Sequence, residues 1–153
     1  MAGQIKTASA VEIANAFSSE GVHVQPIMAD EGCAIPSYRW VWTTFAADWR
    51  RWLEMVGPLG YKPSSNDCDD FARQCAVVAQ ICHARTLKPK HAIDTALAFG
   101  EFWYMATNGA HAINVFVYSD DDDFLRLGFF EPQSSSIVKL TTAHVRSCYF
   151  ARL

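Results

Sequence analysis

The length, composition and charge of the chain exclude several classes of protein. Its 153 residues are 50% hydrophobic and carry 13 basic against 16 acidic side chains, a formal net charge of −3. A chain of this size and apolar content can bury a sizeable core, and its slightly acidic charge gives no basic field for nucleic acid or an anionic membrane, so neither is expected as a partner.

Two helices are expected in the first 60 residues. Ser9 and Glu12 have the spacing of a capping box, which predicts a short helix over residues 9–19. Residues 38–55 place aromatic side chains at intervals of three or four, with charged residues between them. This spacing predicts an amphipathic helix whose aromatic stripe packs in the core.

Two more helices are expected in the middle of the chain. One begins at Asp67 or Cys68, and its apolar residues cover more than one face, which is typical of a buried helix. Residues 91–106 predict another helix, which ends before an Asn-Gly pair.

The pattern then changes to that of strands. Residues 111–118 and 124–131 predict a β-hairpin, and the acidic turn between them is expected to be a solvated tip rather than an ion site. Residues 137–140 and 145–150 supply one or two further strands. Helices first and an antiparallel sheet second predict an α+β fold.

The chain contains five cysteines, which are Cys33, Cys68, Cys75, Cys82 and Cys148. An odd number in a chain with ample apolar content argues against a disulfide framework. The N-terminus lacks the charged-then-apolar pattern of a signal peptide, and no window approaches 18 consecutive apolar residues. We therefore expect a cytoplasmic protein with free thiols.

Cys68 is the cysteine placed for chemistry. It lies at the start of a core helix, where the helix dipole favours a thiolate, and a preceding loop can leave its sulfur facing a cleft. Cys75 and Cys82 continue the same helix and are expected to be inert core thiols. Cys33 and Cys148 have no assigned chemistry.

His111 and Glu131 are expected to meet at one end of the hairpin. His111 opens the first strand, where the sheet can hold a base rigidly beside another element. The hairpin count places the partner of residue 111 near residue 132, within one or two positions of Glu131. The Glu131 carboxylate can then orient the imidazole and stabilise its cation, as a third catalytic group does. His144 is the reserve base.

Four further residues would support this site. The backbone N–H of Cys68 is the natural first oxyanion donor, with Asn66 or Gln133 as the second. Asp69 and Asp70 suit the positive end of the helix dipole, yet acids beside a thiol disfavour its thiolate form. A bound calcium ion would remove that penalty. The chemistry itself requires no cofactor, and these residues can equally be plain first-turn acids.

Three short strings carry a resemblance, and in chain order they are Asp67–Ala72, His111–Val115 and Phe130–Gln133. The order of cysteine, histidine and acid resembles the papain-like and transglutaminase-like cysteine peptidase superfamily. Within it, the strings are most similar to the C-terminal protease domain of the fungal chimerolectin Marasmius oreades agglutinin, and to small bacterial and phage proteins of that type. The resemblance covers residues 36–140 and implies a papain-like fold, a Cys68–His111–Glu131 triad and calcium-dependent proteolysis.

The sequence thus predicts a single cysteine-peptidase-like domain over residues 1–153, with residues 1–35 as an N-terminal extension of unknown role. It would cleave a peptide or amide bond through an acyl-enzyme, with a protein or peptide as substrate. A peptidoglycan amidase or endopeptidase, an acyl transferase and a non-catalytic binding module on the same fold are the alternatives. A homodimer is left open.

Overall fold

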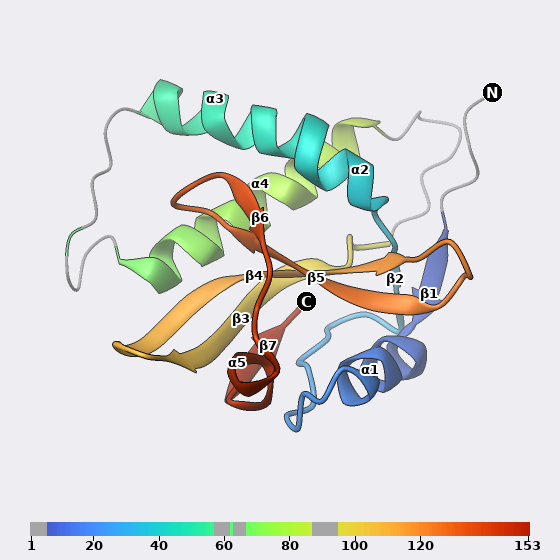
Figure 1. Cartoon of the computed structure of the whole chain (residues 1–153). Helices are drawn as coiled ribbons and strands as arrows, with labels where there is room; N and C mark the ends of the chain where they lie inside the picture. Colours follow the sequence, from blue (N-terminus) through green and yellow to red (C-terminus); the bar gives the residue numbers. More distant parts are fainter. Residues whose placement is uncertain (1–5, 57–61, 63–66, 87–94) are drawn as a thin grey trace.

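The helices pack on an antiparallel sheet, and the computed structural model describes residues 6–56, 62, 67–86 and 95–153 (Figure 1). Within these residues the sheet has five strands, in the order β6 (Ser136–Val138), β5 (Leu125–Glu131), β4 (Gly109–Ser119), β3 (Phe99–Ala106) and β7 (Phe150–Arg152). Neighbouring strands are antiparallel throughout. The α+β fold is therefore confirmed.

One face of the sheet is covered by the first elements of the chain. Strands β1 (Thr7–Ser9) and β2 (Gly32–Ala34) form a small separate sheet, and helix α1 (Ala10–Ser19) lies between them in sequence. The predicted capping box is present, since the Ser9 hydroxyl accepts a hydrogen bond from the Glu12 N–H and the Glu12 carboxylate accepts one from the Ser9 N–H. Buried side chains of these elements share a core with Ile113 and Val115 of β4.

The predicted helix over residues 38–55 is present, with a local change of pitch. It consists of α2 (Tyr38–Trp40), a π-helical turn η1 (Val41–Phe45) and α3 (Ala46–Val56). The aromatic stripe is core only in part, because Phe45 and Trp49 are fully buried while Trp42 is 59% exposed. A π-turn holds more residues than an α-turn, so the 3.6-residue period that would bury the whole stripe is interrupted there.

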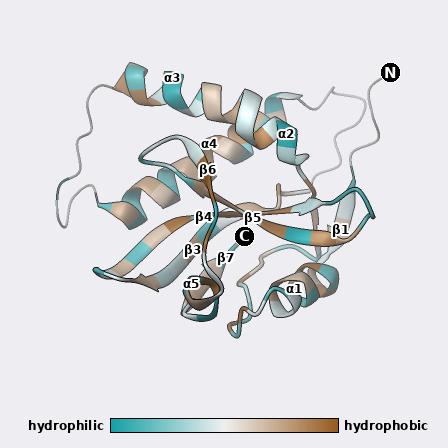
Figure 2. Ribbon diagram, viewed as in Figure 1, coloured by the Kyte–Doolittle hydropathy of each residue, from teal (hydrophilic) through white to brown (hydrophobic). Residues whose placement is uncertain are grey.

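Helix α4 (Cys68–Thr86) begins where the sequence predicts and packs on the same face of the sheet as α3. Its buried residues Phe71, Cys75 and Ala79 share a core with Phe116 of β4. Figure 2 shows hydrophobic residues along β4, β5 and β6, and alternating hydrophilic and hydrophobic residues along α3. None of the described helices is both long and apolar enough to cross a membrane.

Two predicted elements are wrong. The helix expected over residues 91–106 is a strand from Phe99 to Ala106, while residues 91–94 lie outside the described part of the chain. This segment pairs with β4 on one side and β7 on the other, so sheet pairing and aromatic burial decide its conformation. The strand expected over residues 145–150 is also wrong, because residues 145–146 end the short helix α5 (Thr142–Arg146), whose first turn is capped by Thr141, and only Phe150 belongs to a strand, β7.

The predicted hairpin and its tip are confirmed. In the β4–β5 ladder Asn114 lies opposite Phe130 and Ser119 opposite Leu125. At the tip, the Asp120 carboxylate accepts hydrogen bonds from the backbone N–H groups of Asp122 and Phe124 and pairs with Arg126. These bonds lower the pKa of Asp120, with the Arg126 contact as the largest cause. The acidic run therefore closes a turn.

Gly100 allows the backbones of β3 and β7 to approach each other, and a Cβ atom there would overlap the carbonyl oxygen of Arg152. We expect Gly100→Ala to lower the free energy of unfolding by about 2–3 kcal/mol, because the added methyl forces the two strands apart. Denaturant unfolding measures this loss. Met105→Ala on the same strand is the control, since Met105 is half exposed and its loss should change stability by under about 0.5 kcal/mol. Equal effects of the two changes would contradict the prediction.

Candidate active site

The predicted catalytic residues lie at the ends of three different elements. Cys68 is the first residue of α4 and is partly buried, His111 is the third residue of β4, and Glu131 is the last residue of β5. Each is therefore held by regular structure while its side chain stays near solvent.

His111 and Glu131 form a hydrogen-bonded pair. Nε2 of His111 lies 2.8 Å from Oε2 of Glu131, and the side chains are 27% and 17% exposed. The other carboxylate oxygen of Glu131 accepts a hydrogen bond from the backbone N–H of Gln133 at 3.1 Å. The hairpin register predicts this proximity, and both oxygens of the acid are held in place. The catalytic role of the pair stays a prediction.

Cys68 lies toward the end of the sheet where β4 begins. Helix α4 runs alongside β4 in the same direction, because its residue Ala72 is bonded to Asn114 and its later residue Gln80 is bonded to Leu97, just before β3. In Figure 1 the start of α4 and the β3–β4 turn lie at the same, left-hand side of the molecule. The first turn of the helix and the first residues of the strand therefore share one end of the fold.

No hydrogen bond joins the Cys68 sulfur to His111 in the part of the chain that the structure describes. Strand alternation places His111 on the face of Ile113 and Val115, whereas Asn114 faces α4. A reaction between the thiol and the imidazole therefore has to take place at the end of the sheet, where both elements begin.

Tyr104 packs against the imidazole of His111. It lies opposite His111 in the β3–β4 ladder, and its ring meets the imidazole edge-on with centroids 5.8 Å apart. Burial raises the pKa of Tyr104, and negative charge on Glu131 and on Cys68 raises it further.

Tyr149 follows α5 and packs edge-on against Trp103 of β3. Burial raises its pKa, and the charges of Cys68 and Asp69 add to the effect. Sequence analysis missed both tyrosines. Tyr104 would have been found by counting back from His111 across a β3–β4 hairpin, had residues 99–106 been recognised as a strand.

The other four thiols lie in environments that disfavour the thiolate. Burial raises the pKa of Cys33, Cys75 and Cys82, and it raises that of Cys148 to about 11. The reserve base His144 lies on α5, with its ring 5.2 Å from that of Tyr104. Tyr104 thus contacts both histidines.

The carboxylates beside Cys68 form a tight group. Ligand atoms of Asp67, Asp69 and Asp70 all lie within 4.8 Å of one another. A hydrogen bond with Asp67 is the largest cause of a raised pKa at Asp69, followed by burial and like charges. Arg73 offsets this repulsion through ion pairs of 3.2 Å to Asp69 and 3.5 Å to Asp70.

Within the part of the chain that it describes, the structure shows no contact that brings Asn66 or Gln133, the two residues expected to support an oxyanion, to Cys68. Asn66 lies outside the described residues. Gln133 is exposed, and its described contact is the backbone bond to Glu131.

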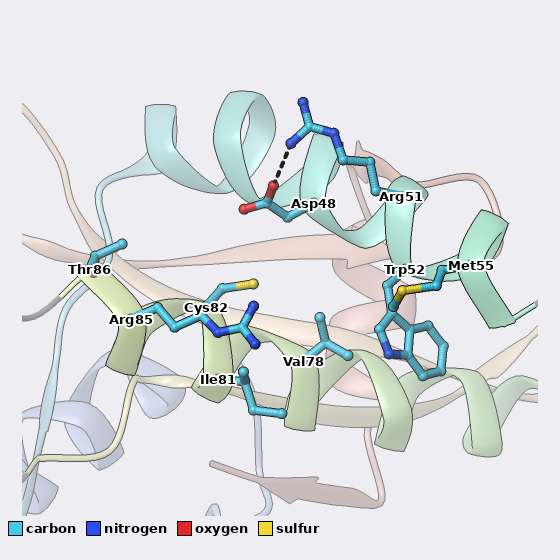
Figure 3. A pocket seen from close by; sticks show the side chains of 9 residues that line it. All are labelled: Asp48, Arg51, Trp52, Met55, Val78, Ile81, Cys82, Arg85 and Thr86. Carbon is cyan, nitrogen blue, oxygen red and sulfur yellow. Dashed lines mark hydrogen bonds and ion pairs between the residues drawn. The ribbon is translucent and has the colours of Figure 1, made fainter.

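A separate cavity of about 500 Å³ lies between α3 and α4 (Figure 3). Trp52, Met55 and Ile81 are among the apolar residues that line it, and the Asp48–Arg51 ion pair lies at its edge. The cysteine that lines this cavity is Cys82, so the cavity does not include the candidate nucleophile Cys68.

Comparison with known proteins supports the fold through structure alone. No protein-family model and no curated protein matches the chain. Two crystal structures of Polyporus squamosus lectin match 96% of it at 19% identity, one bound to a sialylated epitope (TM-score 0.72) and one, PSL1a, in complex with E64 (TM-score 0.71). The fold is papain-like. The chain spans about half the length of these lectin chains, and the C-terminal half of the lectin is its papain-like domain.

The turn that follows Glu131 is held from the helical layer by Trp49, whose indole N–H donates to the carbonyl oxygen of Pro132 at 2.8 Å. We expect Trp49→Phe to cost about 1–3 kcal/mol of stability, because it leaves a buried carbonyl without its donor. Thermal or denaturant unfolding measures the loss. Trp42→Phe in the same helical segment is the control and should be nearly neutral, since Trp42 is exposed. A neutral Trp49→Phe would show that the bond does not stabilise this turn.

Proposed function

We propose that the protein is a cysteine-peptidase-like hydrolase with Cys68 as nucleophile, His111 as base and Glu131 as the acid that orients the base. The observation that carries this is the 2.8 Å pair of His111 and Glu131, at the end of the sheet where α4 begins with Cys68. The complex of the similar lectin with the inhibitor E64 supports a thiol site in this fold.

In the proposed reaction, His111 takes the proton of the Cys68 thiol and the sulfur attacks the carbonyl carbon of a peptide bond. The imidazolium then gives its proton to the leaving amine, so that an acyl-enzyme and a free amine result. Water, deprotonated by the same imidazole, attacks the acyl-enzyme and releases a carboxylic acid and the thiol. Glu131 holds one tautomer of the ring and stabilises its cation.

The oxyanion of this reaction needs preorganised donors. The backbone N–H of Cys68, at the first residue of α4, has no acceptor within the helix and is the proposed first donor. Asn66 and Gln133 stay the candidates for the second.

The test of the nucleophile is selective labelling. We expect E64 to add once to the protein at pH 6.5, on Cys68, because burial disfavours the thiolate of the other four cysteines. Intact-mass measurement and peptide mapping identify the site. Cys68→Ala should lose both the label and the hydrolysis of denatured casein, whereas the matched Cys82→Ala should keep both.

If Cys68→Ala hydrolyses casein as fast as the unsubstituted protein, with and without calcium, the proposed role of Cys68 as nucleophile is wrong. Cleavage of purified cell wall in place of casein would identify a peptidoglycan hydrolase. Uniform slow labelling of all five thiols would instead indicate a binding module. Sedimentation tests separately whether the protein forms a homodimer, which the sequence leaves open.

Calcium is proposed as an activator through Asp69 and Asp70, with Asp67 as a third ligand. Three carboxylates with ligand atoms within 4.8 Å offer the hard oxygen donors that calcium takes, and the ion would replace the Arg73 ion pairs. Binding would also cancel the negative charge next to the thiol.

We expect calcium to raise the rate of casein hydrolysis and a chelator to reverse the effect. Asp69→Asn combined with Asp70→Asn should abolish the stimulation, whereas the more distant Asp48→Asn should retain it. The raised pKa of Asp69 means that this carboxylate takes up a proton at a higher pH than an ordinary aspartate does. Because a protonated carboxyl group cannot bind calcium, calcium affinity should fall as the pH is lowered. Calorimetric titration at several pH values measures this. An affinity that the double substitution leaves unchanged would place the ion elsewhere.

A further inference from the structure

Two side-chain amides fasten α4 to the sheet at different points along the helix. Asn114 of β4 is fully buried, and its Nδ2 donates to the carbonyl oxygens of Ala72 at 2.7 Å and Gly100 at 2.9 Å. Gln80 of α4 donates to the carbonyl of Leu97 at 2.9 Å and accepts from its N–H at 2.8 Å. The first bridge is near Cys68 and the second is far from it.

The orientation of the Asn114 amide is determined by its partners. Both are carbonyl oxygens, so only the NH₂ end of the amide can face them. The other end, Oδ1, is buried and has no hydrogen-bond partner among the described residues. A buried acceptor without a partner destabilises a fold, so an apolar residue of similar shape would suit stability at least as well.

The bridge spans the two elements that carry the proposed nucleophile and base. Ala72 lies four residues after Cys68, about 6 Å along the helix. Asn114 lies three residues after His111, about 10 Å along the strand. The second partner, Gly100, belongs to β3, which pairs with β4 and approaches β7 closely. The amide therefore ties the first turns of α4 to the central strands at a defined register.

We propose that Asn114 is a positioning residue, which holds the first turn of α4 so that the Cys68 thiol meets His111. The inference rests on the proposed hydrolase function and adds to it a residue that does not touch the substrate. Reacting groups have to lie within about 3–3.5 Å, and a misplacement of about 1 Å can cost a factor of about 100 in rate. A side chain that sets the register of the helix can therefore matter more for rate than for stability.

The test is Asn114→Leu, which removes donor and unpaired acceptor together with little change in volume. We expect the midpoint of thermal unfolding to fall no further than in Gln80→Leu, because each variant removes at least two side-chain hydrogen bonds to the backbone while Asn114→Leu also removes a buried unpaired acceptor. The kcat for casein-derived peptide should fall at least tenfold while KM stays within about twofold, since Asn114 is buried away from substrate. Alkylation of Cys68 by iodoacetamide at pH 6.5 should slow in parallel.

The matched control is Gln80→Leu, which removes the second bridge, twelve residues or about 18 Å from Cys68 along the helix. It leaves the N–H and the carbonyl of Leu97 without the Gln80 bonds and should lower the unfolding midpoint, yet kcat should stay within about twofold. Asn114→Thr keeps one donor on a residue that suits strands, and its kcat should fall between those of the unsubstituted protein and Asn114→Leu. If the Asn114→Leu variant does not fold, the Asn114→Thr variant tests the proposal in its place.

The outcomes separate the two proposals. If Asn114→Leu keeps the kcat and the rate of Cys68 alkylation of the unsubstituted protein, the positioning role is overturned and the hydrolase proposal stands. An equal fall in kcat for Gln80→Leu would overturn the positioning role as well. If the unsubstituted protein neither hydrolyses peptide nor labels at Cys68 faster than at Cys82, the hydrolase proposal fails and the positioning role fails with it. A fall in kcat and Cys68 reactivity confined to the Asn114 variants, with the fold intact, supports the inference.

Discussion

The pairing of β4 with β3 on one side and β5 on the other is the constraint on which the rest of the structure depends. This central strand places His111 opposite Tyr104 and brings its imidazole to Glu131. Its alternation sends Ile113 and Val115 into the core that α1 shares, and Asn114 and Phe116 into the layer of α3 and α4. A shift of one residue in the β4–β5 ladder would turn Glu131 to the other face and separate it from His111, whereas a shift in the β3–β4 ladder would move Gly100 away from Asn114.

Hydrogen bonds position the side chains of the candidate site, while apolar packing holds together the helices and the sheet that carry them. The helical layer is held by buried aromatic side chains such as Phe45, Phe99 and Phe130, whose rings pack at angles of 54–68° with centroids 5.0–6.2 Å apart. Packing of this kind is strong but tolerates small sliding of a helix. Asn114 and Trp49 add directional bonds from opposite layers, and each acts within a few residues of a proposed catalytic group.

Electrostatics distinguishes Cys68 by its neighbours. Four thiols lie where burial raises their pKa, whereas Cys68 begins a helix next to three carboxylates, two tyrosines and, across the end of the sheet, the His111–Glu131 pair. The carboxylates oppose a thiolate and the helix dipole favours it. An ion or a proton at Asp69 would therefore change the balance between these two effects at the Cys68 thiol.

Local patterns in the sequence determined much of this protein. The capping box of Ser9 and Glu12, the start of α4 at Cys68 and the hairpin that brings His111 to Glu131 were all predicted, because each depends on residues close together in the chain. Tertiary structure alone decided that residues 99–106 form a strand, since their partners lie in β4 and β7, and that Trp42 is exposed within a π-turn. It also decided that Tyr104 and Asn114 belong to the neighbourhood of the site. The bond from Asn114 to Ala72 joins residues 42 positions apart, which no spacing along one segment encodes, and Tyr104 meets His111 only because residues 99–106 form a strand beside β4.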